Sequence, residues 1–156
     1  MKTKQLIKST LLSTLLLSSF FYLAVASGQD KKQDKEEDKV EEKLKTEKAI
    51  IVSSNELFEK YQSNEVAADE KFKGKVIQVN GKILDISKNI IDEDEIIVKL
   101  NGLIDNEFDM LGVNFYFDKK HSSEVATLSK GDEITIKGIC KGKTIVVSVE
   151  GCSLVK

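Results

Sequence analysis

The stretch FKGKVIQVNGKILDI, residues 72–86, predicts a long β-strand that bends in its middle. Ile77, Val79 and Ile83 share one parity, which is the pattern of a strand with one face in a hydrophobic core. The apolar parity changes after Gly81, and a glycine at such a change is typical of a β-bulge or a sharp bend. The bend favours a closed barrel over a generic five-stranded sandwich, which is the alternative.

Four further strands and two short helices are predicted around this strand. The strands, recognised by alternating apolar residues, cover residues 96–100, 113–117, 134–136 and 145–149. A turn before the last strand is predicted at Lys141-Gly142-Lys143. One helix begins near Ser53, before the first strand, and the other near Ser122 or Ser123, between the third and fourth strands. The fold expected is therefore mainly β, a five-stranded OB-fold barrel with an N-terminal helix.

The composition argues against an enzyme and against a metal centre. The chain has 156 residues, enough for one domain, with two Cys and one His. Cys140, Cys152 and His121 cannot supply four zinc ligands on their own. A single His with no Cys nearby does not form a Ser/His/Asp or Cys/His catalytic group. We therefore expect no catalytic residue, no metal and no cofactor, and we place His121 on the surface beside a helix cap.

The first 26 residues have the three parts of a secretory signal peptide. Three lysines, the last of them Lys8, precede an uncharged, leucine-rich run that ends in Ala24-Val25-Ala26. Cleavage is expected between Ala26 and Ser27, and retention as a membrane anchor is the alternative. A lipoprotein would carry Cys in place of Ser27. The product is thus expected to be periplasmic or secreted and not lipid-anchored, with membrane contact only through the leader before cleavage.

Residues 27–48 are predicted to be a charged, disordered linker before a folded domain over 49–156. Val40 and Leu44 are the only apolar side chains between residues 29 and 48, too few to offset the entropy lost on ordering. Pairs such as Glu41 and Lys45 can give transient helix. The folded domain has 14 Lys, no Arg and 18 Asp plus Glu, a net charge of −4.

A ligand-binding face is predicted on the outside of the second and third strands. If Phe115 and its neighbours of the same parity fill the core, the residues on the outer face are Ile97, Lys99, Asn114 and Tyr116. OB barrels bind their ligands on this face. Here it offers one aromatic ring and one cation, and a stacked base contributes only about 1–3 kcal/mol.

The charge of the domain disfavours nucleic acid as a partner. Acidic residues fill the loop at 92–95 and recur at Asp105, Glu107 and Asp109, where they would repel phosphate. Lys71, Lys73 and Lys75 are expected to protect an exposed strand edge. Calcium could bind clustered carboxylates, but the spacing does not match an EF-hand, so we expect these loops simply to be solvated.

The pairing of Cys140 and Cys152 is left open by the sequence. An exported domain with two cysteines favours a disulfide. A tight turn at 141–143 would instead place Cys152 eight residues from the position opposite Cys140, more than about 20 Å away.

Three blocks of the sequence resemble the tRNA-anticodon-like (tRNA_anti-like) OB-fold family. They are NEVAADEKFKGKVIQVNGKI (64–83), LSKGDEITIKGICKG (128–142) and VVSVEGCSLV (146–155). Members are short bacterial proteins, many of them exported or lipidated, so the resemblance implies an OB fold and a binding role without an established ligand. We accordingly expect an exported, non-catalytic binding module for a protein, peptide or small ligand of the cell envelope. The alternative is a module that binds single-stranded nucleic acid on the same face.

Overall fold

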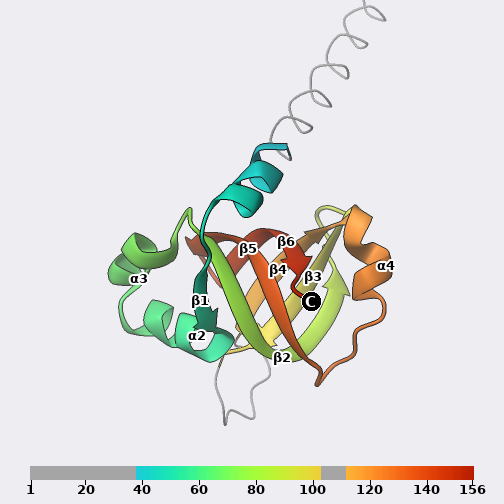
Figure 1. Ribbon diagram of the computed structural model, residues 1–156. Coiled ribbons are helices and arrows are strands. Elements are labelled where there is room, and N and C mark those ends of the chain that lie inside the picture. The colour runs from blue at the N-terminus through green and yellow to red at the C-terminus, as the bar shows by residue number, and fades with distance from the viewer. Residues whose placement is uncertain (1–37, 103–111) are drawn as a thin grey trace, which may run out of the picture. The chain divides into compact units, whose positions relative to one another are not determined.

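The computed structural model describes residues 38–102 and 112–156, and its compact unit spans Val40–Lys156 (Figure 1). Its strands are β1 (Ile50–Ser53), β2 (Val76–Lys88), β3 (Glu95–Asn101), β4 (Gly112–Asp118), β5 (Glu133–Lys143) and β6 (Val147–Leu154). Its helices are α2 (Ser54–Ser63), α3 (Glu65–Phe72), the 3-10 turn η1 (Lys119–His121) and α4 (Ser122–Val125), and a further helix covers 38–46. None of the helices in the described ranges is both long and apolar enough to cross a bilayer.

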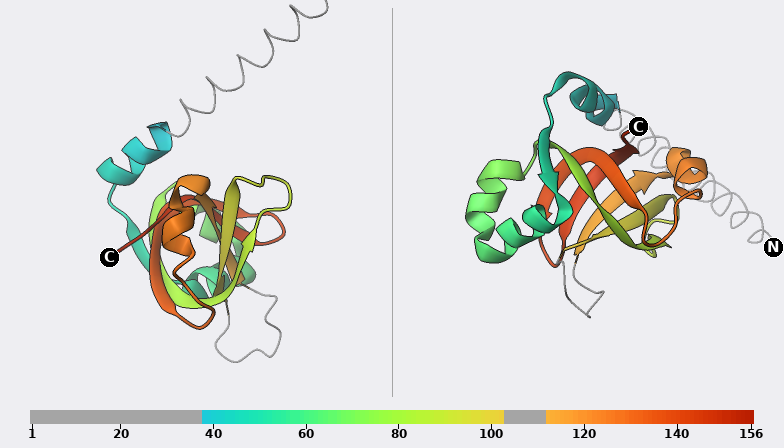
Figure 2. Two further views of the ribbon diagram at one scale, coloured as in Figure 1. Left: turned by 90° about the vertical axis from the view of Figure 1, so that its right-hand side faces the viewer. Right: turned by 60° about the horizontal axis from the view of Figure 1, so that its bottom comes forward.

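Five of the strands close into a barrel, as the sequence predicted. β2 pairs with β5 up to Lys82 and with β3 from Ile83 onward. β3 pairs with β4, β4 with β6 in parallel, and β6 with β5, which completes the ring of an OB fold (Figure 2). The register of β2 against β3 shifts between Ile83 and Asp85, so the predicted bend after Gly81 is a change of partner followed by a bulge.

Gly81 allows the first helix to approach the bend closely. A Cβ atom at this position would lie 2.2 Å from Oγ of Ser54, the first residue of α2 and fully buried. Oγ of Ser54 donates to Oδ1 of Asn101 at 3.2 Å. Oδ1 of Asn101 also accepts from the backbone N–H of Lys82 at 3.1 Å. The bend, the start of α2 and the end of β3 are thereby joined at one point.

The core matches the predicted parity of the strands. Ile77, Val79 and Ile83 are at most 2% exposed, and Phe115 and Phe117 are fully buried. Helix α2 closes one end of the barrel with side chains that belong to the same hydrophobic cluster, namely Leu57, Phe58 and Tyr61. The predicted cap is confirmed, because Oγ of Ser53 accepts from the backbone N–H of Glu56 at 3.1 Å.

Two boundaries near the first barrel strand differ from the prediction. The strand begins at Val76, whereas Phe72 is the buried last residue of α3. Asn64 ends α2 and caps α3, its Oδ1 accepting from the backbone N–H of Ala67. β1, which the prediction lacks, pairs in parallel with the first half of β2.

The last hairpin also turns later than predicted. β5 runs on through Lys143, and the turn is at 144–146, where Ile145 is 90% exposed. Gly142 has φ +90° and lies at a register shift, so its conformational freedom serves a bulge inside the strand rather than a turn.

Because the turn is at 144–146 and not at 141–143, the separation of more than about 20 Å expected between Cys140 and Cys152 no longer follows. Cys140 is opposite Val149, which is three residues before Cys152. Cys140 and Cys152 are both buried free thiols. Sγ of Cys140 lies 3.4 Å from the hydroxyl of Tyr61, and Sγ of Cys152 lies 3.4 Å from the carbonyl oxygen of Val149.

The chain before the barrel departs from the predicted linker. Residues 38–46 are helical, and the pair Glu41–Lys45 that suggested transient helix forms an ion pair at 3.3 Å. The predicted signal peptide over 1–26, its cleavage site and the first part of the linker lie outside the described residues.

Candidate nucleic-acid or peptide interface

The four predicted binding residues lie together on the outer face of β3 and β4. The antiparallel register places Ile97 opposite Tyr116 and Lys99 opposite Asn114, so they form two neighbouring cross-strand pairs. All four are half-buried, while the alternate residues of both strands belong to the core. We call these four residues the β3–β4 face.

Asn114, which is next to β6, has an unsatisfied side-chain oxygen on this face. Its Oδ1 is buried and has no hydrogen-bond partner in the described part of the chain. Lys99 on β3 and Ser148 on β6 are its cross-strand neighbours. A buried oxygen without a donor costs about 1–3 kcal/mol, and a ligand N–H or O–H group offsets this cost when the Asn114 side chain turns outward to meet it.

The cation of the face has an acidic neighbour. Asp85 on β2 is opposite Lys99 on β3. The ammonium group of Lys130, 2.6 Å from Asp85, lowers the pKa of this carboxyl, and Lys99 contributes in the same direction. The negative charge of Asp85 therefore opposes the attraction between Lys99 and an anion.

One end of the face is acidic. Glu95 and Asp118 are opposite each other at the ends of β3 and β4. Partial burial raises the pKa of Glu95, and the charges of Asp92, Glu150 and Asp118 add to this effect, although a hydrogen bond from Asn89 opposes it. Like charges gathered at this end repel phosphate and favour a cationic group on a ligand.

The acidic loop before β3 is held by its own hydrogen bonds. Oδ1 of Asp92 accepts from the backbone N–H of Asp94 at 3.0 Å, and Lys119 forms an ion pair with Asp94. Within residues 38–102 and 112–156, no three His, Cys, Asp or Glu side chains are grouped so that they could hold a metal ion. Asp105, Glu107 and Asp109 lie outside those ranges.

The remaining residues named from the sequence have local partners. His121 lies at the start of α4, with its ring centroid 6.1 Å from that of Phe117 and its Nδ1 3.6 Å from Glu124. Lys71, Lys73 and Lys75 surround the end of α3 rather than a strand edge. They contact Glu56 at 3.9 Å, Asp69 at 2.8 Å and the carbonyl oxygen of Glu70 at 2.7 Å, respectively.

Sequence reasoning missed the neighbours that modify this face. Asp85 was not assigned to it, because the bulge at Ile83–Asp85 changes which side the later residues of β2 occupy. Ser148 and Glu150 were missed because the last strand was placed without its register. The alternation of Val147 and Val149 could have found them, since it turns the residue after each valine outward.

Comparison with known proteins places the chain in a family and supports its fold. A proposed nucleic acid-binding lipoprotein from Klebsiella pneumoniae subsp. pneumoniae MGH 78578 is 24% identical, over 68% of this chain and 92% of that one, with a TM-score of 0.55. An OBody, AM3L09, bound to hen egg-white lysozyme is 20% identical over 55% of this chain and 86% of that one, with a TM-score of 0.41. A search of curated proteins finds no match. The family model tRNA_anti-like matches residues 1–153. This chain, whose described residues form an OB-fold barrel, therefore belongs to the tRNA_anti-like family.

Proposed function

We propose that the chain is an exported, non-catalytic binding module that holds its ligand on the β3–β4 face. The observation that carries the proposal is the unsatisfied Oδ1 of Asn114, which belongs to one of two neighbouring cross-strand pairs of half-buried side chains. Around that oxygen the face offers an aliphatic side chain, an aromatic ring and an ammonium group. This combination suits a ligand that brings a hydrogen-bond donor together with apolar surface.

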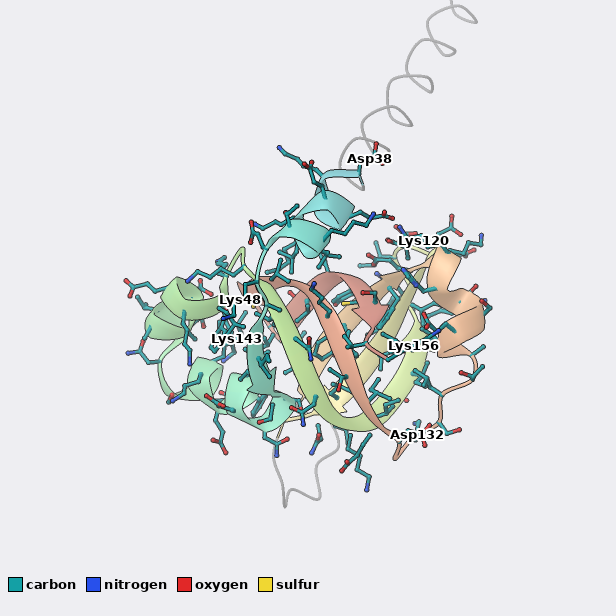
Figure 3. The ribbon with its side chains drawn as sticks, viewed as in Figure 1. Asp38, Lys48, Lys120, Asp132, Lys143 and Lys156 are labelled. Atoms are coloured by element: carbon teal, nitrogen blue, oxygen red, sulfur yellow. The ribbon has the colours of Figure 1, made fainter. Side chains whose placement is uncertain are left out.

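The favoured ligand is a protein segment, a peptide or a small molecule of the cell envelope. A peptide supplies N–H donors at every residue, which is what Asn114 lacks. The acidic end formed by Glu95, Asp118 and Glu150 favours a ligand with a cationic group on that side. Side chains of both signs are mixed over the surface seen in Figure 3, so broad attraction of a polyanion has little support.

Export is proposed from the first 26 residues. The lysines before a leucine-rich run and the Ala24-Val25-Ala26 end support a leader that is removed before Ser27. Ser27 is also the reason to propose a periplasmic or secreted product without a lipid anchor, because lipidation at this point needs a Cys.

Binding of single-stranded nucleic acid is the second candidate, favoured by Tyr116 and Lys99 on the face. A ring can stack on a base, and Lys99 can contact one phosphate. Each phosphate contact gives a salt slope of about −0.7 for single strands. With Lys99 alone, affinity for an oligonucleotide should fall only about fivefold between 20 and 200 mM salt.

The test compares two classes of probe on the same variants. Two probes are offered to the purified chain and to its Tyr116→Ala and Asn114→Ala variants. Ile51→Ala, at an exposed position of β1, is the control. The first probe is a phage-displayed library of random dodecapeptides. The second is a labelled mixed-sequence oligonucleotide, followed by anisotropy at the two salt concentrations.

Peptides that bind the wild-type chain and Ile51→Ala but not the two face variants would support the proposal. Peptide binding that is unchanged in Tyr116→Ala and Asn114→Ala would refute the location of the site. Micromolar oligonucleotide binding that is lost with Tyr116→Ala would replace the first candidate by the second. A salt dependence much steeper than fivefold would show that lysines outside this face carry the contact.

A further inference from the structure

A cavity of about 700 Å³ lies where β2 and β5 pair beside α4, and we call it the β2–β5 cavity. β2 contributes Asn80 and Gly81 to its lining, and β5 contributes residues 133–135. The other side is formed by Glu124 and Thr127 of the α4 segment and by residues 154–156. Sites for small ligands usually have about 300–1,000 Å³, so this cavity is large enough for one.

The pairing of β2 with β5 brings two polar side chains together at the cavity. Asn80 is opposite Thr135, and each follows or precedes a fully buried residue of its strand, Val79 and Ile136 respectively. The side chains of Asn80 and Thr135 therefore point away from the core. In the part of the chain that the structure describes, neither side chain has a hydrogen-bond partner. An amide and a hydroxyl group that each donate and accept are thus available to a ligand.

The two carboxylates of the cavity are balanced by cations. Glu124 lies 3.6 Å from Nδ1 of His121 and 3.9 Å from Nζ of Lys156. Glu133 on β5 is directly opposite Lys82 on β2. Two lysines therefore accompany two glutamates, and the cavity attracts neither cations nor anions strongly.

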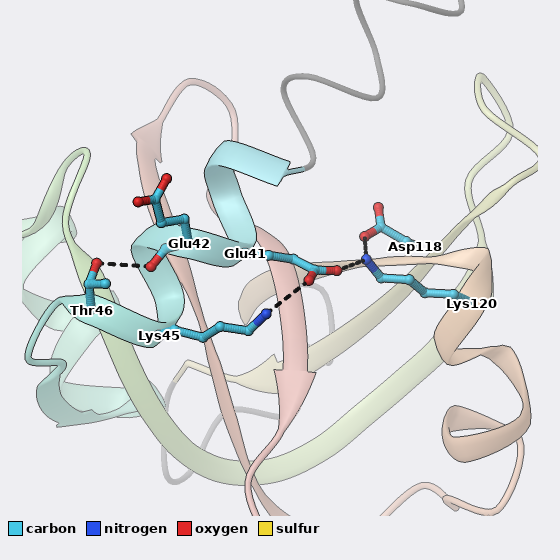
Figure 4. Close-up of polar contacts among 6 residues, drawn as sticks. All are labelled: Glu41, Glu42, Lys45, Thr46, Asp118 and Lys120. Carbon is cyan, nitrogen blue, oxygen red and sulfur yellow. Dashed lines mark hydrogen bonds and ion pairs between the residues drawn. The ribbon is translucent and has the colours of Figure 1, made fainter.

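The lysines that flank α4 in the sequence have acidic partners of their own. Nζ of Lys120 lies 2.6 Å from Oε1 of Glu41 and 3.5 Å from Oδ2 of Asp118 (Figure 4). Nζ of Lys130 lies 2.6 Å from Oδ1 of Asp85. These lysines therefore add little attraction for a phosphate or another anion at the cavity.

Aliphatic side chains complete the lining of the cavity. Ile134 and Leu154 pack against the hydrophobic core but remain half-buried, and Val155 is 37% exposed. The backbone N–H of Val155 donates to the carbonyl oxygen of Thr135 at 2.9 Å, which holds residues 154–156 beside β5. Among the described residues, no aromatic ring lines the cavity, so a nucleic-acid base has no platform for stacking there.

We propose that the β2–β5 cavity is a second binding site, which takes a neutral, polyhydroxylated ligand, namely a mono- or disaccharide. Every saccharide hydroxyl group both donates and accepts, which matches the amide of Asn80 and the hydroxyl of Thr135. The two oxygens of Glu133 accept from neighbouring hydroxyl groups of the ring. The C–H groups of the ring pack against Ile134 and Leu154, and the balanced charge of the cavity suits a ligand without charge.

The probes are the neutral disaccharides maltose, cellobiose and N,N′-diacetylchitobiose, titrated into the isotopically labelled, purified chain and followed by amide chemical shifts. We expect at least one of them to move the amide signals of Asn80, Thr135 and Leu154, with a dissociation constant in the millimolar range or below. The signal of Tyr116, on the β3–β4 face, should not move. Putrescine, a cation, and citrate, an anion, are the charged controls and should leave the cavity signals unchanged.

Substitutions locate the site. Thr135→Val removes one hydroxyl group and should weaken saccharide binding about fivefold, the effect of one hydrogen bond. Asn80→Ala, at an exposed position, should weaken it by a similar factor and serves alone if Thr135→Val does not fold, which far-UV circular dichroism shows. Thr144→Val makes the same change in the exposed turn after β5 and is the matched control, expected to bind like the wild-type chain.

The proposal is overturned if none of the disaccharides moves the cavity signals at about 20 mM, a concentration that detects millimolar affinity. Saccharide binding that no folded variant of the cavity weakens would overturn it as well. Shifts of the cavity signals with putrescine or citrate, but with no disaccharide, would show that the ligand is charged and not a saccharide.

Discussion

Replacing Gly81 by Ala tests how closely the first helix approaches the bend of β2. The added Cβ would lie 2.2 Å from Oγ and 2.9 Å from Cβ of Ser54, and 3.3 Å from Cδ1 of Leu100. Ser54 is fully buried and cannot rotate away into solvent. The substitution must therefore move the start of α2 or the middle of β2.

The expected loss of stability follows from three effects. Crowding in a packed site costs about 1–3 kcal/mol. Breaking the hydrogen bond from Ser54 to Asn101 costs about 1 kcal/mol, although Asn101 keeps the backbone N–H of Lys82 as a donor. Alanine restricts the unfolded chain, which offsets about 0.4–1 kcal/mol. We expect Gly81→Ala to lower the free energy of unfolding by about 2 kcal/mol.

Urea unfolding followed by far-UV circular dichroism measures this change. Gly74→Ala is the control, because its Cβ would meet nothing within 4 Å and only its φ of +73° opposes the change. Adding Ser54→Gly to Gly81→Ala should recover at least about 1 kcal/mol, as expected for residues in contact. The reasoning fails if Gly81→Ala lies within about 0.5 kcal/mol of wild type, or if Ser54→Gly recovers nothing.

Two further predictions concern titratable groups. Because the pKa of Glu95 is raised, the folded protein binds more protons than the unfolded chain just above the ordinary carboxyl range, and stability falls as pH rises there. Glu95→Gln should therefore raise the urea midpoint at pH 7 but not below about pH 4, and an equal gain at both would refute this. Burial raises the pKa of both Cys140 and Cys152, so Ellman's reagent should react with neither until urea unfolds the chain. If the unfolded chain reacts with Ellman's reagent only after a reductant is added, the two cysteines are joined in a disulfide and are not free thiols.

The alternation of apolar and polar residues was sufficient to predict which side chains lie on the β3–β4 face, but not which residues surround it. Phe115 and Phe117 could be assigned to the core from parity alone, and that assignment turned Asn114 and Tyr116 outward. The position of Asp85 beside Lys99 depends on a one-residue bulge, and such a bulge reverses every later side chain of a strand. The unsatisfied Asn114 oxygen depends on three-dimensional packing, which a sequence pattern does not contain.

The two main differences between the predicted and the observed fold involve Gly142 and the charged segment before the barrel. Gly142 was expected in a turn because turns and bulges both use a positive φ, and only the pairing of Lys143 with Val147 distinguishes them. Residues 38–46 were expected to be disordered, as part of the linker over 27–48, because Val40 and Leu44 are too few apolar residues to offset the entropy lost on ordering. The contacts of this helix are with residues distant in the sequence, among them the hydrogen bond from Nζ of Lys137 to the carbonyl oxygen of Leu44.

The change of partners along β2 has a consequence for how the barrel opens. One continuous strand supplies the neighbour of β5 in its first half and the neighbour of β3 in its second, so neither side of the barrel has a complete set of strands of its own. Loss of β2 from one side removes the support of the other. Amide hydrogens of β3 and β5 should therefore exchange through a common global opening. Those of β1, whose one partner among the described strands is β2, can exchange by local fraying.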